Sequence, residues 1–313
     1  MAPQASKHPS ASERVWRQLE AAPRTSLTRD LSQADLQTLL LDVTRGRAAD
    51  VTPARLIQRW EQDRYVEPSA SDPRKVSRAE AGLWALLPGE FAGLTLSPVT
   101  PLGTSTALGP VSQNRVISTI RGSEVVSDPT NVLALEAALR RRTAKSATDP
   151  VHLAACHTVL RGQPFEAPGV FQHFRLFALV SSARDRGSAA TEADLLTAHL
   201  SFWIAAMAAL VPRGRATVSY TVLDFPPLAQ RVTDTVLPSI GPLPGNVTIE
   251  EDPDRQHGRG YYQRGAIKIC ADGQEMGDGG FTDWTARLNN DAKERCFTSC
   301  LSTERLAALD GQG

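Results

Sequence analysis

Two apolar runs of strand length, residues 153–160 and 174–181, follow each other along the chain. The loop between them has no helical pattern and contains Gly162 and Pro164, so the two runs are expected to pair as neighbouring antiparallel strands. Further strand-like runs lie at residues 115–120, 217–223, 266–271 and 296–301. Apolar patterns of helical period lie between them at residues 131–142, 192–210 and 228–237. This mixture predicts an α+β fold in which helices flank an antiparallel sheet.

A chain of 313 residues is long enough for one large domain, or for a core with a small appendage. Residues 1–12 are rich in Ser, Pro and Ala and are expected to be disordered. Residues 13–74 are predicted to form a small N-terminal helical appendage and a linker. Its helices are expected to begin after Ser32, which is followed three positions later by an aspartate, and after Thr52, which is followed by proline. Residues 75–313 carry the mixed pattern and form the main predicted domain.

Basic and acidic residues number 34 each, so the formal net charge is zero. A broad basic face for a phosphate backbone is not expected, which argues against tRNA as a partner. The first twelve residues contain no apolar run typical of a signal peptide. The longest apolar stretch, residues 200–211, is too short to span a bilayer. These features predict a cytoplasmic protein that does not bind a membrane.

Four cysteines, at positions 156, 270, 296 and 300, lie in apolar or strand-like surroundings without a C-x-x-C pair. Cys296 and Cys300 are four residues apart, which suggests a metal, but no histidine lies near them in the sequence. Reduced thiols packed in the core are the favoured interpretation. Whether the chain holds a metal stays unknown at this stage.

Two polar positions stand beside predicted elements. Asp128 precedes Pro129 at a predicted helix start, where a carboxylate commonly caps amide groups and proline presets the first turn. The same carboxylate can instead receive a ligand's ammonium group through a charge-assisted hydrogen bond. Arg161 follows the first strand run and is either a surface arginine or a binding residue, since its planar fork of donors suits carboxylates and phosphates.

Three clusters occupy the last sixty residues. They are His257-Gly258-Arg259-Gly260-Tyr261-Tyr262, Gly279-Gly280-Phe281-Thr282-Asp283 and Thr303-Glu304-Arg305-Leu306. The paired glycines predict a turn, or a place where backbone approaches closely. The two tyrosines either share a site or alternate between the two faces of a strand.

In order and spacing, these segments resemble the catalytic core of class II aminoacyl-tRNA synthetases, and most closely that of histidyl-tRNA synthetase. That family carries R-P-E-G-T before a helix, F-R-x-E at a strand end, and then R-G-x-D-Y-Y-T-G, G-G-R-Y-D and G-x-G-x-E-R-L. The resemblance covers about residues 98–309 and implies a class II synthetase-like antiparallel sheet in the domain 75–313. It also implies a pocket for an amino acid and ATP with Mg²⁺, and a homodimer. No anticodon-binding domain is recognisable, as in paralogues such as the regulatory subunit of ATP phosphoribosyltransferase.

The resemblance assigns a role to each matching position. The substrate amino group is expected to meet Asp128 and Thr130, and the amino-acid site to include Tyr261, Tyr262 and Asp283. ATP is expected to contact Arg161, Phe174 and Arg305, and Arg161 also to hold the substrate carboxylate. His257 stands where the family has an arginine, and Arg259 is an alternative source of that charge. Five of these residues are therefore expected to converge on one pocket: Asp128, Arg161, Tyr261, Asp283 and Arg305.

Several positions depart from the family pattern, namely Gln163, His257, Phe281, Cys300 and Ser302. One functional hypothesis is a stand-alone ligase that forms an acyl-adenylate from an amino acid or related carboxylate and passes the acyl group to an acceptor other than tRNA. The alternative is a catalytically inactive paralogue that senses an amino acid as the regulatory subunit of a protein partner. A third is an unrelated α+β interaction protein. The sequence identifies neither the amino acid nor the acceptor.

Overall fold

The computed structural model describes residues 16–17, 23–144, 146, 149–163 and 171–309. The chain forms two compact units, Met1–Trp60 with Thr119–Gly122, and Glu61–Ser118 with Ser123–Gly313. The units thus divide after Trp60, whereas the sequence places the appendage and its linker up to residue 74. The predicted disorder of residues 1–12 concerns residues outside the described part of the chain.

In the first unit, the described residues before Trp60 are mostly helical, whereas Thr119–Gly122 form a turn. The unit contains α2 (Pro23–Thr25), the π-helix η1 (Ser26–Asp30), α3 (Gln33–Ala49) and most of α4 (Pro53–Gln62). Both predicted helix starts are confirmed. The hydroxyl of Ser32 accepts a hydrogen bond from the backbone N–H of Asp35 at 3.1 Å, and the hydroxyl of Thr52 accepts one from the N–H of Arg55 at 3.4 Å.

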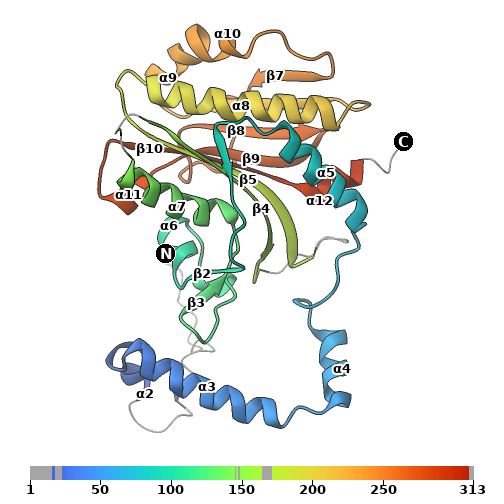
Figure 1. The fold of residues 1–313 in the computed structure, drawn as a ribbon, viewed down its shortest axis with the longest axis vertical. Coiled ribbons are helices and arrows are strands. Elements are labelled where there is room, and N and C mark those ends of the chain that lie inside the picture. Colours follow the sequence, from blue (N-terminus) through green and yellow to red (C-terminus); the bar gives the residue numbers. More distant parts are fainter. Residues whose placement is uncertain (1–15, 18–22, 145, 147–148, 164–170, 310–313) are drawn as a thin grey trace, which may run out of the picture. The chain divides into compact units, whose positions relative to one another are not determined.

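The second unit is built around a large mixed sheet (Figure 1). Its strands are β1 (Phe91–Gly93), β4 (Val151–Leu160), β5 (His173–Arg184), β6 (Ala216–Val222), β7 (Val247–Glu251), β8 (Gln263–Ala271), β9 (Gln274–Thr282) and β10 (Glu294–Ser302). Two short strands, β2 (Val99–Pro101) and β3 (Ser123–Val125), form a separate pair. The helical segments are α5 (Pro73–Leu86), α6 (Thr104–Leu108), η2 (Gln113–Arg115), α7 (Pro129–Thr143), α8 (Ala190–Leu210), α9 (Pro226–Arg231), η3 (Val232–Val236), α10 (Leu237–Ile240), α11 (Trp284–Asn289) and α12 (Thr303–Leu309).

The strand order is β1-β4-β5-β10-β9-β8-β6-β7. The predicted pairing of the first two long strands is confirmed: β4 and β5 are antiparallel, in a register that runs from Val151 opposite Ser182 to Leu160 opposite His173. All the inner pairs are antiparallel, and only the edge strands β1 and β7 pair parallel with their neighbours. The α+β class expected from the sequence is therefore the observed one.

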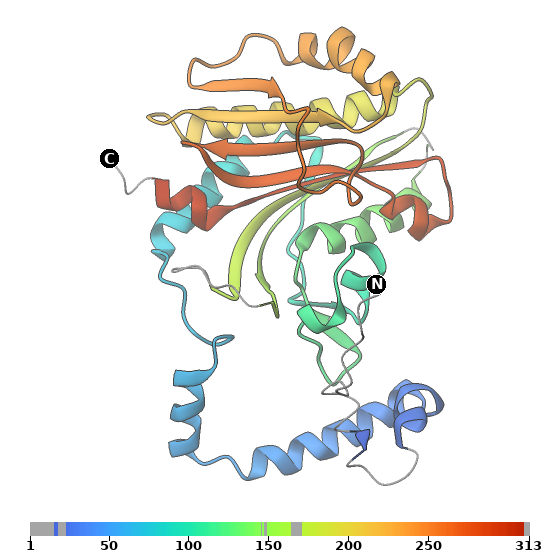
Figure 2. The same ribbon diagram turned by 180° about the vertical axis from the view of Figure 1, so that it is seen from behind.

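Alternation along the strands divides the core into two layers. In β5, Phe177 and Leu179 pack with α8, while Ala178 and Val180 pack with α7 on the opposite face. Seen from behind, the gold strand β6 passes in front of the yellow helix α8, and the red strands of the sheet run beside it (Figure 2). By length and composition α8 is apolar enough to cross a membrane, but 56% of its most apolar window is buried inside the protein. The apolar character of α8 is thus explained by its position in the core.

Two predictions of local structure are wrong. Residues 115–120 do not form a strand: Arg115 ends η2, which the hydroxyl of Ser112 caps, and the strand that follows begins only at Ser123. The pair Gly279 and Gly280 is not a turn, because both residues lie inside β9.

The close backbone approach that the glycine pair also suggested is present. A β-carbon on Gly279 would lie 2.4 Å from the carbonyl oxygen of Thr298, and one on Gly280 would lie 2.5 Å from the ring of Tyr262. The glycines thus let β9 lie against β10 and leave room for a tyrosine ring.

Candidate ligand-binding site

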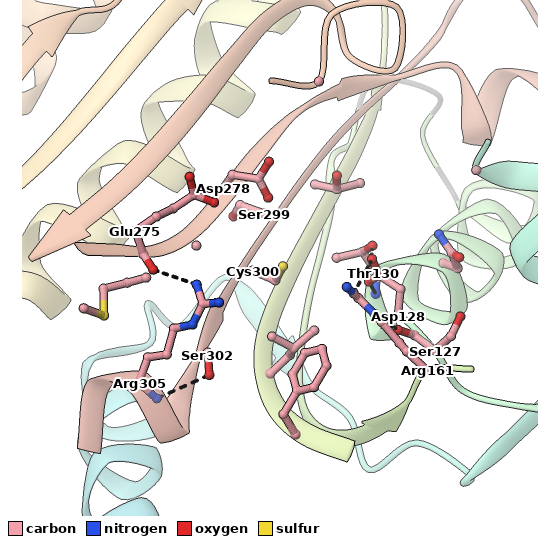
Figure 3. A pocket seen from close by; sticks show the side chains of 18 of the residues that line it. Ser127, Asp128, Thr130, Arg161, Glu275, Asp278, Ser299, Cys300, Ser302 and Arg305 are labelled. Carbon is pink, nitrogen blue, oxygen red and sulfur yellow. Dashed lines mark hydrogen bonds and ion pairs between the residues drawn. The ribbon is translucent and has the colours of Figure 1, made fainter. Parts of the chain in front are cut away.

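A cavity of about 590 Å³ lies in the second unit, within the range of small-molecule sites. Its wall is assembled from the start of α7, the facing ends of β4 and β5, the turn before β8, strands β9 and β10, and α12. In Figure 3, Asp128 and Arg161 lie on one side of the cavity and Glu275 and Arg305 on the other. Eight of the predicted site residues line it: Asp128, Thr130, Arg161, Phe174, His257, Tyr261, Tyr262 and Arg305.

Asp128 is the N-cap of α7, as the structural interpretation of the sequence predicts. Its Oδ1 accepts hydrogen bonds from the backbone N–H of Thr130 at 2.9 Å and from the Thr130 hydroxyl at 2.6 Å. Capping therefore occupies one oxygen and leaves Oδ2 directed at the cavity side, 3.8 Å from an Nη atom of Arg161. The capping and binding interpretations are compatible, because each uses a different oxygen.

Arg161 is held from two sides. Its Nε donates to the backbone carbonyl of Ser127 at 3.0 Å, and its guanidinium carbon lies 5.0 Å from the centre of the Phe174 ring. The 3.8 Å separation between Arg161 and Asp128 is an ion pair, but it is too long for a hydrogen bond. The Nη donors thus face a carboxylate oxygen without being saturated by it, in a setting where both side chains are about one-third exposed or less.

The middle of the cavity is formed by Tyr261, Tyr262 and Cys300. The two rings are 4.7 Å apart, and both tyrosines follow a turn in which their N–H groups donate to the carbonyl of Gly258. Gly258 has φ +79°, and a β-carbon there would lie 2.8 Å from the Tyr262 ring. Burial raises the pKa of all three groups, so at neutral pH this surface consists of neutral hydroxyls and a thiol.

Asp278 and Arg255 form a charged pair that the sequence reasoning missed. Asp278 lines the cavity from β9, and its Oδ2 accepts a hydrogen bond from Arg255 at 3.2 Å. Arg255 is nearly inaccessible, with a side chain that is 3% exposed, and it also donates to the carbonyls of His257 and Ile267. Burial raises the pKa of Asp278, although Arg255 and a hydrogen bond from Tyr262 act in the opposite direction. In the sequence, Asp278 stands between Gly277 and Gly279, and this glycine-rich pattern predicted a turn instead of a binding residue.

Arg305 lies at the other side of the cavity. Its Nη1 donates to the backbone carbonyl of Glu275 at 2.7 Å, and its N–H donates to the hydroxyl of Ser302 at 3.3 Å. The carboxylates of Glu275 and Glu304 belong to the same wall, and burial raises the pKa of Glu304. This end therefore combines one arginine with two acids, and Ser302 and Cys300 place side chains where the family has glycines.

Two predicted site residues lie outside the cavity. Asp283 precedes α11 and forms a half-exposed ion pair with Arg287 at 3.5 Å, so the expected convergence fails for this residue. Arg259 donates to the carbonyls of Pro253 and Arg255 within its own turn, which directs its charge away from the cavity. Of the two residues considered for the position where the family has an arginine, His257 lines the cavity and Arg259 does not.

Within the described residues, no group of three or more His, Cys, Asp or Glu side chains is placed to hold a metal ion. The four cysteines are free thiols.

Comparison with known proteins places the fold. No model of a protein family matches the chain, and no curated protein sequence matches it. Solved structures do match. An ATP phosphoribosyltransferase regulatory subunit/histidyl-tRNA synthetase from Bacillus halodurans gives a TM-score of 0.57 at 10% identity, over 78% of this chain and 82% of that one.

Two histidyl-tRNA synthetase structures are similar in the same way. The S. aureus enzyme gives a TM-score of 0.54 at 13% identity, over 76% of this chain and 65% of that one. The histidine–tRNA ligase subunit from Alicyclobacillus acidocaldarius gives 0.52 at 13% identity, over 78% and 95%. At such low identity the likeness establishes the fold alone. The chain therefore has the fold of the class II aminoacyl-tRNA synthetase catalytic core, of the kind found in histidyl-tRNA synthetases and their regulatory-subunit relatives.

Proposed function

We propose that this protein binds a free α-amino acid at the Asp128 and Arg161 end of its cavity. The observation that carries the proposal is the unsaturated pair of opposite charges. The capping hydrogen bonds of Asp128 use Oδ1, so Oδ2 is available to a ligand. Arg161 donates to Ser127 through Nε, so its Nη donors are available as well, 3.8 Å from Oδ2. A zwitterion needs an acceptor for its ammonium group and a donor fork for its carboxylate, and charge-assisted hydrogen bonds supply both.

The charge of the cavity supports ligand binding without ATP turnover. Three arginines line it, Arg115, Arg161 and Arg305, against four acids, Asp128, Glu275, Asp278 and Glu304. A triphosphate placed among these groups finds no surplus of positive charge to offset its own. This supports the regulatory alternative, in which the protein senses an amino acid on behalf of a protein partner. One structural neighbour is named as an ATP phosphoribosyltransferase regulatory subunit/histidyl-tRNA synthetase.

Amino-acid activation is the second candidate, because Arg161 and Arg305 line one cavity and Phe174 lies against Arg161. In that case the two arginines would hold the phosphates, and ATP would supply the phosphoanhydride that activates the substrate carboxylate. The residues of the chain would act through orientation and charge stabilisation, since no covalent nucleophile is required. His257 would contribute charge only when protonated.

The test is a calorimetric and thermal-shift screen of the common amino acids and their simple analogues, with and without ATP·Mg²⁺. We expect at least one amino acid to bind the wild type, and Asp128→Asn to weaken it by about tenfold or more because the ammonium loses its countercharge. The half-exposed Asp283, substituted to Asn, is the matched control. Amino-acid-dependent exchange of pyrophosphate into ATP separates the candidates: exchange supports activation, whereas binding without exchange supports sensing. Failure of every amino acid to bind refutes the proposal.

A further inference from the structure

The cavity contains more charged groups than a simple zwitterion requires. The amino and carboxylate groups of an amino acid are matched by Asp128 and Arg161, which leaves Asp278 as a further carboxylate on the wall. Asp278 lies on the inner strand β9, and Cys300 lies between it and Asp128 (Figure 3). Tyr262 forms a hydrogen bond with Asp278, and its ring is 4.7 Å from that of Tyr261. We call the three side chains Tyr261, Tyr262 and Cys300 the floor of the cavity.

The counterion of Asp278 sits behind it and not in the cavity. Arg255 is 3% exposed and is fixed by three acceptors: the carbonyls of His257 and Ile267, and Oδ2 of Asp278. It does not line the cavity, whereas Asp278, with a side chain that is 22% exposed, does. A ligand therefore meets a carboxylate whose position is fixed by a buried arginine, and it is shielded from that arginine's donors.

Asp278 presents its carboxylate to the cavity beside neutral side chains. Burial keeps the two tyrosines and the cysteine neutral, and the hydrogen bond between Tyr262 and Asp278 orients the carboxylate further. Arg255 balances the charge of Asp278 from behind, but its donors are directed at three acceptors of the protein, so the carboxylate is the group that a ligand contacts. Direct contact with this carboxylate favours a cationic group of the ligand at this place over a neutral or anionic one.

We propose that Asp278 is a specificity-determining residue that receives a second cationic group, so that the ligand is an amino acid with an amine or guanidinium at the end of its side chain. This inference rests on the proposed function, because Asp128 and Arg161 must hold the backbone end of the same molecule. The size of the cavity, about 590 Å³, is ample for such a side chain to extend over the tyrosine and cysteine floor.

The experiment is isothermal titration of the full-length protein with L-ornithine, L-lysine and L-arginine, and with the neutral analogues L-norvaline and L-norleucine. On the wild type we expect at least one basic amino acid to bind about tenfold or more tightly than both neutral ones, as the second charge-assisted contact requires. This comparison needs no variant and stands even if a substitution at Asp278 prevents folding.

Asp278→Asn is then expected to remove the preference: affinity for the basic ligand falls about tenfold or more, while affinity for norleucine changes less than about threefold. Asp283→Asn, the same substitution at a carboxylate outside the cavity, should leave both affinities unchanged. Equal binding of basic and neutral amino acids, or tighter binding of the mostly neutral histidine, overturns this inference while leaving the proposed function intact. Absence of binding by every amino acid overturns both.

Discussion

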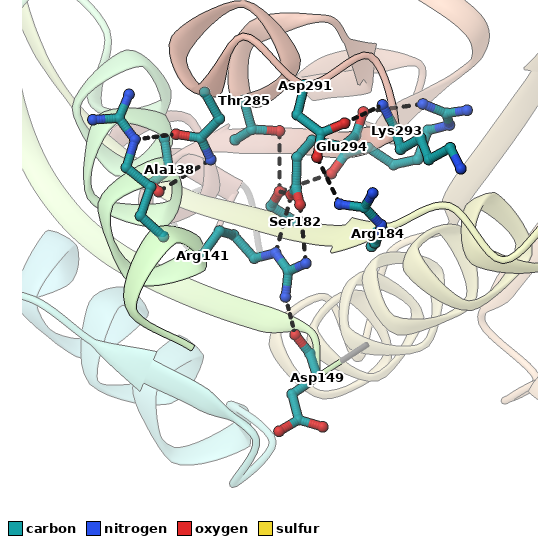
Figure 4. A network of polar contacts seen from close by, with 12 residues as sticks. Ala138, Arg141, Asp149, Ser182, Arg184, Thr285, Asp291, Lys293 and Glu294 are labelled. Carbon is teal, nitrogen blue, oxygen red and sulfur yellow. Dashed lines mark hydrogen bonds and ion pairs between the residues drawn. The ribbon is translucent and has the colours of Figure 1, made fainter. Parts of the chain in front are cut away.

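Replacing the buried Arg141 tests how much the ion pair between α7 and β10 stabilises the fold that carries the candidate site. Arg141 lies near the end of α7, the helix whose first turn is capped by Asp128, and it forms a bidentate pair with Glu294 of β10 at 3.0 and 2.9 Å (Figure 4). The side chains of Arg141 and Glu294 are 2% and 6% exposed, so water solvates neither charge appreciably. Ser182 donates a further hydrogen bond to Glu294 at 3.2 Å.

Arg141→Met keeps an apolar stem of similar length but leaves the Glu294 carboxylate with the Ser182 hydroxyl as its remaining partner among these contacts. Breaking a buried ion pair from one side costs about 3–5 kcal/mol, because the other charge stays desolvated. The double variant Arg141→Met/Glu294→Leu removes both charges, and it is expected to recover most of that loss. The coupling between the two substitutions should therefore exceed about 2 kcal/mol.

The assay is urea unfolding followed by tryptophan fluorescence and circular dichroism. The neighbouring Arg140, paired with Glu136 at 2.8 Å on the exposed side of the same helix, provides the control. Arg140→Met should cost only about 0.3–0.5 kcal/mol, the usual value for a surface pair one helical turn apart. If Arg141→Met costs no more than Arg140→Met, or if the double variant is as unstable as the single one, the argument from the buried ion pair is refuted.

Two further predictions concern buried residues. Burial lowers the pKa of His199 and of His152, so both stay neutral in the folded protein at a pH where the unfolded chain already binds protons. The free energy of unfolding is therefore highest above about pH 6.5. It falls as the pH decreases below that value, by up to about 1.4 kcal/mol per pH unit for each extra proton that the unfolded chain binds. Urea titrations across this range should show the loss, and His199→Gln should reduce its slope; an unchanged slope contradicts the assignment. Gly279→Ala would place a β-carbon 2.4 Å from the Thr298 carbonyl and should destabilise the protein by about 1–3 kcal/mol, whereas Gly89→Ala, where nothing lies within 4 Å, should not. Equal melting temperatures for the two alanine variants would refute the close-approach explanation of the glycine pair.

Most of the fold could be predicted because its signals are local. The pairing of β4 with β5 follows from two apolar runs without a helix between them, and the helices α7 and α8 follow from their apolar period. The strand predicted at residues 115–120 is absent although their composition suits a strand. A capped 3₁₀ turn ends at Arg115, and the carbonyls of Arg115 and Ile117 accept hydrogen bonds from Gly162 and Val125 instead of from one regular partner strand. The parallel edge strands β1 and β7 also escaped prediction, since both are short and pair with partners distant in the sequence.

Site residues could be predicted where they lie at the end of a helix or strand that the sequence already indicates. Asp128 at a helix start and Arg161 at a strand exit both reach the cavity, because the ends of α7 and β4 meet there. The side chain of Asp283 depends instead on the direction of the chain after β9, and it turns to pair with Arg287. Asp278 was missed because it lies within a strand, where only the register with β10 determines which face it occupies.

The departures from the family pattern are not spread evenly over the cavity. At the Asp128 end the polar groups suited to an amino acid are present, whereas Ser302 introduces a side chain at the Arg305 end and Cys300 introduces one between the two ends (Figure 3). Phe281, which replaces the family's arginine, is buried against Phe297 at 4.6 Å and does not line the cavity. Different elements supply the two ends of the cavity, so side chains at the Arg305 end can change without altering the Asp128 end. This separation is consistent with the proposed amino-acid sensing, in which the Asp128 end binds the ligand and no phosphate has to be held among the acids of the cavity.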